Sequence, residues 1–196
     1  MKPFVAAVFL FCLLSEPLRA QDHFEASPVA TTIPDLQVVT QTGDHLHFNS
    51  QIVKGRIAIV TGFLTTCSSM CPITQEKLSE VARVLGPRLG KEVVIVSLSV
   101  DANRDTPKRM KAWGEKFHVG RGWVLAGGEK ARVDQLLKSL GLYVDVPQRH
   151  QSALMIGNDE YGWFRISSWA PTEKLVGLVD TLAARKNTVG VSSASR

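Results

Sequence analysis

The sequence predicts a single α/β domain in which helices cover a mixed central sheet. Segments rich in β-branched residues, such as 57–60 and 93–100, alternate with segments that carry apolar residues at helical spacing, such as 72–85. Two short apolar segments and a last helix then close the chain. This order is typical of an α/β sandwich whose sheet is partly antiparallel.

The first twenty residues are expected to be a secretory signal peptide that takes no part in the fold. Lys2 precedes the apolar stretch 4–14, and Ala20 supplies a small residue at the cleavage position. The apolar stretch is about half as long as a membrane-spanning helix needs to be, so we expect no stable membrane anchor. Cys12 lies inside this signal and is expected to be a bystander. The mature protein is therefore expected to be periplasmic or secreted.

Composition and cysteine count restrict the functional class. Of the 196 residues, 44% are apolar and 21% are charged, as in ordinary globular proteins. The formal net charge is +5, but the basic residues form no run and do not interleave with aromatic residues, so nucleic acid is not expected as a partner. Without the signal, only Cys67 and Cys71 remain. A disulfide between cysteines four residues apart closes no long loop and would add little stability. The pair is therefore expected to have a chemical role and not a structural one.

The chain is expected to divide into four parts. These are a signal peptide over 1–20, a loose leader over 21–32, one folded domain over 33–186 and a polar, disordered tail over 187–196. The domain is expected to begin with a β-hairpin, in which strands over 36–39 and 46–48 flank the turn 41–44.

The remaining elements follow in strand–helix units. Asp105, Thr106 and Pro107 suit the start of a helix, Gly141 suits the end of another, and the turn 157–160 suits a second hairpin. We expect strands over 56–63, 93–100, 123–125, 152–156 and 163–166, and helices over 72–85, 107–117, 130–140 and from about 172 onward.

Cys67 and Cys71 lie where the strand over 56–63 turns into the helix over 72–85. The positive end of a helix lowers the pKa of a thiol, and the thiolate either binds metal or attacks a disulfide. Two cysteines at a strand–turn–helix favour a thioredoxin-like sandwich with a mixed central sheet and an N-terminal β-hairpin. The spacing is one residue longer than CxxC, and it is compatible with two roles. The cysteines could form a redox-active disulfide, or they could share one soft ion, Cu(I) or zinc.

A protected copper site needs a third ligand, commonly an imidazole. His45 and His47 alternate on a hairpin strand and could hold a metal, although an exposed strand tip is the favoured interpretation. In a thioredoxin-like sheet, the loop that enters the strand over 152–156 packs against the cysteine turn, and His150 lies in that loop. On position alone, a solvated loop histidine is the commoner case. The candidates are His23, His45, His47, His118 and His150.

Several blocks, in order, resemble the Sco/SenC family of thioredoxin-like copper proteins, over roughly 33–184. The first is the stretch from Gly62 to Pro72, which contains the CxxxCP motif. The others are the strand and turn Ser97-Leu98-Ser99-Val100-Asp101 with Arg104-Asp105-Thr106-Pro107, the helix with Lys111-Ala112-Trp113, and His150 with Ser152.

The resemblance implies a Cu(I)/Cu(II) site made by Cys67, Cys71 and His150, with Asp101 near it. Members of the family deliver copper to the dinuclear centre of cytochrome c oxidase or keep its cysteines reduced. The implied partner is therefore a copper-receiving exported or membrane protein, such as a cytochrome c oxidase subunit. The chain departs from the family in one block, because Arg149 stands before His150 where the family usually has an aspartate, and Gln151 is inserted before the serine.

Two functions from different classes follow. The first is a periplasmic copper metallochaperone that uses Cys67, Cys71 and His150. The second is a thiol–disulfide oxidoreductase, for which Cys67 and Cys71 form the redox-active pair and neither metal nor His150 is needed. A peroxidase that uses one cysteine with Arg149, and a zinc site with two cysteines and one histidine, are further alternatives.

Overall fold

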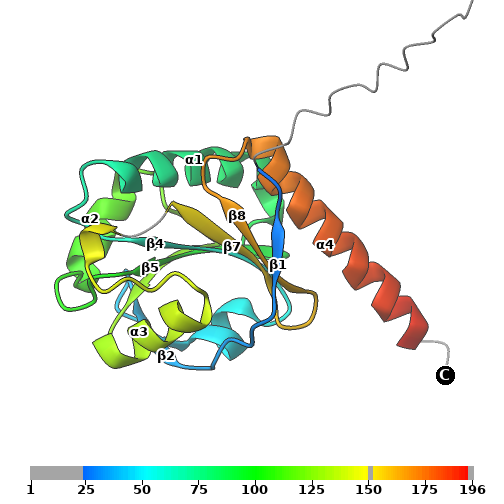
Figure 1. The fold of residues 1–196 in the computed structure, drawn as a ribbon, viewed down its shortest axis with the longest axis horizontal. Helices are drawn as coiled ribbons and strands as arrows, with labels where there is room; N and C mark the ends of the chain where they lie inside the picture. The colour runs from blue at the N-terminus through cyan, green and yellow to red at the C-terminus, as the bar shows by residue number, and fades with distance from the viewer. Residues whose placement is uncertain (1–23, 150–151, 194–196) are drawn as a thin grey trace, which may run out of the picture.

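A computed structural model describes residues 24–149 and 152–193. These residues form an eight-stranded sheet with helices on both faces (Figure 1). The strands are β1 (Ser27–Val29), β2 (Gln37–Thr40), β3 (His45–His47), β4 (Ile57–Phe63), β5 (Val93–Ser99), β6 (Trp123–Gly127), β7 (Ala153–Asn158) and β8 (Gly162–Ser167). The helices are α1 (Met70–Leu85), α2 (Pro107–Glu115), α3 (Lys130–Ser139) and α4 (Thr172–Ser193), with short helical segments η1 (Phe48–Val53), η2 (Gly86–Arg88) and η3 (Pro147–Arg149).

The sheet is mixed. Its strand order is β1-β8-β7-β4-β5-β6-β2-β3. The three central strands β4, β5 and β6 run parallel, whereas β7 is antiparallel to β4, and β2 is antiparallel to β6. β2 and β3 form the N-terminal hairpin. The predicted α/β sandwich with a mixed central sheet and an N-terminal β-hairpin is thereby confirmed.

The two central strands explain where the cysteine turn lies. Every residue of β4 and β5 is buried, which is why both read as near-continuous apolar runs. They pair in parallel from Ile57 opposite Val93 to Phe63 opposite Ser99. Because parallel strands end at the same edge of a sheet, the cysteine turn after β4 and the loop after β5 are neighbours.

β7 brings a third segment to the same edge. It runs antiparallel to β4, with Thr61 opposite Leu154. The hydroxyl of Thr61 donates a hydrogen bond to the carbonyl oxygen of Ala153 at 3.2 Å. The first residues of β7 therefore lie beside the last residues of β4, at the end that carries the cysteine turn.

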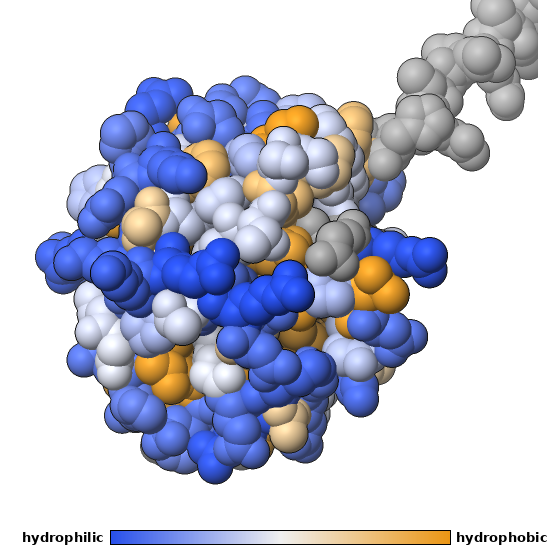
Figure 2. All heavy atoms as spheres, turned by 90° about the vertical axis from the view of Figure 1, so that its left-hand side faces the viewer, coloured by the Kyte–Doolittle hydropathy of each residue, from blue (hydrophilic) through white to orange (hydrophobic). Residues whose placement is uncertain are grey.

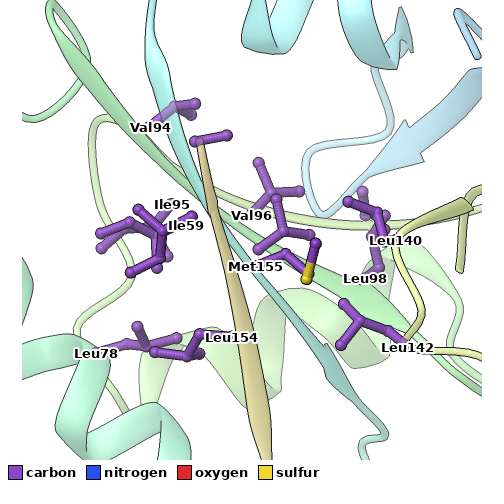
Figure 3. Packing of buried hydrophobic residues seen from close by; sticks show 14 of the residues in the cluster. Ile59, Leu78, Val94, Ile95, Val96, Leu98, Leu140, Leu142, Leu154 and Met155 are labelled. Atoms are coloured by element: carbon purple, nitrogen blue, oxygen red, sulfur yellow. The ribbon is translucent and has the colours of Figure 1, made fainter. Parts of the chain in front are cut away.

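The core has two layers, one on each face of the sheet (Figure 3). Side chains alternate between the faces along each strand. On one face, Ile59 packs near Leu78 of α1, and on the other, Val96 and Met155 pack near Leu140 at the end of α3 (Figure 3). All five side chains are fully buried. This packing fixes α1, and with it the first turn that carries Cys71, against the sheet.

The leader is less loose than its composition predicts. Within 21–32, the short strand β1 pairs antiparallel with β8, with Ser27 opposite Arg165. The hydroxyl of Thr31 also donates to the carbonyl oxygen of Ser139 at 2.8 Å. Both contacts use backbone groups, and Ala26 and Val29 also pack against the core, so this short strand forms without a long periodic apolar pattern.

α4 runs to Ser193 and so extends into 187–196, the segment that the sequence predicts as a polar, disordered tail. Once a helix is nucleated, each further residue adds a hydrogen bond at small cost, so a polar composition does not by itself end it.

The predicted signal peptide over 1–20, with Cys12, lies outside the described residues. Among the helices that the structure does describe, none is both long and apolar enough to cross a bilayer.

Two glycines provide a test of the fold. Gly157 of β7 has φ +145°, and a Cβ there would lie 2.0 Å from the carbonyl oxygen of Gly162. We predict that Gly157→Ala lowers the free energy of unfolding by about 3 kcal/mol or more, since both backbone strain and a clash result. Urea denaturation of the reduced protein measures the change.

Gly177→Ala is the matched control. Gly177 lies in α4, and a Cβ there would meet no atom within 4 Å. Alanine at this helical position should raise the free energy of unfolding by about 0.5–1 kcal/mol. Equal losses in the two variants would contradict the packing of β7 against β8.

Candidate metal centre

Cys67 and Cys71 are brought together at the start of α1. Cys67 lies in the turn, where its N–H donates to the carbonyl oxygen of Leu64 at 3.2 Å. Cys71 lies in the first turn of the helix, and its N–H donates to the Sγ of Cys67 at 3.3 Å. No disulfide joins the two sulfurs. The four-residue spacing thus places one cysteine just outside the helix and the other inside it.

The two thiols differ in exposure and acidity. Burial works to raise the pKa of Cys67, but hydrogen bonds from Cys71 and Ser69 outweigh it and hold the pKa below its ordinary value. Burial raises the pKa of the Cys71 thiol far above the usual range, and its hydrogen bond with Cys67 acts in the same direction. Cys67 is half-buried, and Cys71 is fully buried. Cys67 is therefore the thiolate that an incoming ion or disulfide meets first.

Asp105 holds the cysteine turn in place. Its carboxylate accepts hydrogen bonds from the N–H of Thr65 at 3.2 Å and from the hydroxyl of Thr65 at 2.6 Å. It also accepts from the hydroxyl of Ser99, the last residue of β5, at 2.7 Å. Within the described part of the chain, Asp105 is the one charged residue that is buried. Its charge adds to the effects that raise the pKa of Cys71.

The sequence does not predict this role of Asp105. Its pattern favours Asp105 as part of the cap of α2, and the family resemblance implies Asp101 as the acid near the site. The cap is Thr106, whose hydroxyl accepts from the N–H of Arg109 at 3.4 Å. Asp101 lies half-buried in the loop, 3.7 Å from the guanidinium of Arg104. The sequence does contain a signal for this role. In the block Asp105-Thr106-Pro107, the hydroxyl of Thr106 is enough to cap the helix, which leaves the carboxylate of Asp105 available for another contact.

His150, the predicted third ligand, lies outside the described residues. The residues on either side are described. Arg149 ends η3 and is exposed, and the carbonyl oxygen of Ser152 accepts from the N–H of Ser168 at 3.0 Å. The hydroxyl of Ser168 in turn lies 3.4 Å from that of Thr74 in α1. The chain that follows residue 151 therefore starts beside the helix that carries Cys71.

The other candidate histidines lie elsewhere. His23 is outside the described residues. His45 and His47 are on β3, which β5, β6 and β2 separate from β4. The ring of His47 lies 3.1 Å from the carbonyl oxygen of Asp35. His118 lines a groove of about 1040 Å³ beside α1, with Pro72 and Phe117.

The donor set at the cysteine turn suits a soft metal ion. Over residues 24–149 and 152–193, no three histidine, cysteine, aspartate or glutamate side chains converge as a complete metal site. Cys67 and Cys71 supply two sulfurs, and soft thiolates select Cu(I) or zinc over harder cations. The described residues supply no third ligand of this kind, and His150, which lies between Arg149 and Ser152, stays the predicted one.

Comparison with known proteins identifies the family of the chain. The family model SCO1/SenC matches residues 25–161, which is most of the chain. A protein of Stutzerimonas stutzeri, provisionally named as copper-binding, is 30% identical over 118 residues, which are 59% of this chain and 54% of that protein. The chain spans about half the length, or somewhat less, of the curated relatives it matches.

Two solved structures share the fold. Copper-bound ScoI of Bradyrhizobium japonicum matches with a TM-score of 0.65 and 21% identity, over 77% of this chain and 99% of that chain. BsSco, a member of the Sco family of cytochrome c oxidase assembly proteins in which a disulfide switch was identified, matches with a TM-score of 0.69 and 19% identity, over 82% and 98%. The predicted thioredoxin-like form of the sandwich is confirmed by this likeness.

The asymmetry of the thiols can be tested by alkylation. We predict that iodoacetamide modifies Cys67 at least about tenfold faster than Cys71 at pH 8, because only Cys67 is accessible and has a lowered pKa. The rate at Cys67 should reach half its maximum at a lower pH than that of a cysteine in an unstructured peptide. Peptide mapping by mass spectrometry measures both rates, and Cys71→Ser is the control that keeps the backbone donor. Faster modification of Cys71 would refute the assignment.

The anchoring role of Asp105 gives a second prediction. Asp105→Ala should lower the free energy of unfolding by about 2–4 kcal/mol, because donors on Thr65 and Ser99 lose their acceptor. Asp180→Ala removes a carboxylate from an exposed ion pair with Arg88 and should cost less than about 1 kcal/mol. Urea denaturation of both reduced variants provides the comparison, and equal losses would argue against the anchor.

Proposed function

Because the chain belongs to the SCO1/SenC family, we propose that it is a copper metallochaperone in which Cys67, Cys71 and His150 hold one copper ion. The recipient would be an exported or membrane cuproprotein, such as a subunit of cytochrome c oxidase. A signal peptide over 1–20 would place the protein in the periplasm or outside the cell. The observation that carries the proposal is the hydrogen bond from the N–H of Cys71 to the Sγ of Cys67. It lies at the edge of the sheet where β7, the strand that follows His150 in the chain, begins.

The contrast between the two thiols suits reversible delivery. Cys67 is accessible, so a ligand of the recipient can approach the ion from its side. Cys71 is buried against the core at the start of α1, so it keeps the second sulfur at a fixed position. Both sulfurs bind as thiolates, and copper uptake would therefore release protons, most of all from Cys71.

The same contrast favours a second candidate, a thiol–disulfide oxidoreductase that keeps the cysteines of a cuproprotein reduced. An accessible thiol of lowered pKa beside a buried thiol of raised pKa is the arrangement of an attacking and a resolving cysteine. In this reaction the Cys67 thiolate attacks a partner disulfide, and a mixed disulfide forms as one partner thiolate leaves. Cys71 then attacks the Cys67 sulfur, which releases the second partner thiolate and leaves a Cys67–Cys71 disulfide.

Copper titration separates the candidates. The reduced mature protein should bind one Cu(I) in competition with a colorimetric chelator. Cys67→Ser, Cys71→Ser and His150→Ala should each weaken the affinity about 100-fold or more, since a lost ligand costs at least as much as a lost supporting contact. His118→Ala is the matched control and should stay within about twofold, because His118 follows the far end of α2, whose start lies beside the cysteine turn. A parallel titration with zinc tests the alternative metal.

Absorption and spin resonance of the Cu(II) form report whether an imidazole nitrogen binds. Unchanged affinity and spectra in His150→Ala would remove that residue from the site. If disulfide reduction by that variant also continued at the wild-type rate, the oxidoreductase would be the better account.

A further inference from the structure

A group of exposed cations surrounds the start of α2, and the proposed copper site uses none of them. We call it the basic cluster, and it comprises Arg104, Lys108, Arg109 and Lys111. Arg104 lies 3.7 Å from Asp101, whereas no ion pair within the described residues involves the other three. Three cationic groups are therefore left to solvent or to a partner.

The stability of α2 does not account for these cations. The amino end of a helix carries partial positive charge and favours acidic side chains, yet the first turn of α2 has no acidic residue. Lys108 and Lys111 are also three residues apart, a spacing at which like charges repel each other on one face. Both effects oppose the helix by a small amount, so the cluster is better explained by contact with something outside the chain.

The basic cluster lies beside the cysteine turn. Asp105, which follows Arg104 directly, holds Thr65 two residues before Cys67. Figure 1 shows the segment between β4 and α1 at the same end of the sheet as α2. Figure 2 shows this end of the molecule, where strongly hydrophilic side chains cross the middle of the face beside apolar ones.

Two exposed apolar side chains, Ile73 in the first turns of α1 and Trp169 after β8, are together called the apolar pair. Ile73 is 49% exposed and Trp169 is 50% exposed, which are high values for large apolar side chains. The hydrogen bond between Thr74 and Ser168 joins the two segments, since each residue is the chain neighbour of one member of the pair. Ile73 is two residues from Cys71. The cysteine turn thus has the basic cluster on its Thr65 side and the apolar pair on its Cys71 side.

We propose that the basic cluster and the apolar pair dock a protein whose surface carries carboxylates next to apolar side chains, and hold it over Cys67. The inference rests on the proposed function, because the docked protein is the one that exchanges with the cysteine pair. Charge complementarity selects an acidic partner and steers its approach. The two surfaces lie on different elements with the sulfurs between them, and not on one amphipathic helix, which favours a protein over a lipid surface.

The test uses the reduced mature protein without copper and two synthetic 12-residue peptides. Each peptide contains one cysteine blocked by thionitrobenzoate, with leucines and either glutamates or lysines around it. Attack by Cys67 forms a mixed disulfide and releases coloured thionitrobenzoate, which stopped-flow absorption follows. We predict that the acidic peptide reacts about tenfold or more faster than the basic one at low salt. At 0.5 M salt the difference should largely disappear.

The triple variant Lys108→Glu, Arg109→Glu, Lys111→Glu should abolish or reverse this preference. The matched control is the triple variant Lys54→Glu, Lys91→Glu, Arg121→Glu, which changes the net charge by the same amount. These three exposed residues precede β4, β5 and β6 and so lie at the opposite end of the sheet. Trp169→Ala should slow exchange with the leucine-containing acidic peptide by about threefold and leave a serine-containing version unchanged. An uncharged probe, hydroxyethyl disulfide, should react equally with all variants.

Equal losses in the two triple variants would overturn the proposal, because net charge and not the cluster would then set the rate. It would also be overturned if the cluster variant lost only binding to phosphatidylglycerol vesicles, which would make the surface a membrane contact. No copper enters these assays. If the protein does not bind copper, the metallochaperone proposal fails and the docking proposal stands. If the acidic peptide reacts no faster than the basic one, the docking proposal fails and the metallochaperone proposal stands.

Discussion

The hydrogen bonds that the Asp105 carboxylate accepts are the constraint on which the site depends. β4 and β5 pair up to Phe63 and Ser99, but beyond that point the cysteine turn leaves the sheet. Asp105 joins the two chains there by accepting from Thr65 and from Ser99. A buried carboxylate is costly unless donors surround it, so its presence fixes three donors in one arrangement. The turn can then present Cys67 at a defined place above the start of α1.

The anchored turn makes the two sulfurs unequal. Cys71 is held in the core by α1, whereas Cys67 stays accessible and accepts the N–H of Cys71. Equal thiols would suit neither candidate function, because metal transfer needs one ligand that a partner can reach, and disulfide exchange needs one thiol that attacks first. The asymmetry follows from the four-residue spacing, which leaves one cysteine outside the helix and places the other in its first turn.

The sequence predicts most of this fold because β4 and β5 are apolar throughout and α1 repeats apolar residues at helical spacing. It does not predict β1, because a three-residue strand is too short to show an alternating apolar pattern and is held by its pairing with β8. The roles of Asp105 and Thr106 could not be separated for a similar reason. Both can cap a helix, and only the position of Thr65, forty residues earlier, decides that Asp105 turns inward.

The antiparallel direction of β7 brings the start of this strand to the cysteine turn. Because Leu154 pairs with Thr61, the chain enters β7 at the edge where β4 ends. If β7 ran parallel to β4, its entry would lie at the other end of a six-residue strand, about 20 Å away at ~3.3 Å per residue. No loop adjustment near Arg149 could compensate for that distance. A mixed sheet is therefore a requirement of any site that combines Cys67 and Cys71 with the segment before β7, and a wholly parallel sheet with the same side chains could not form it.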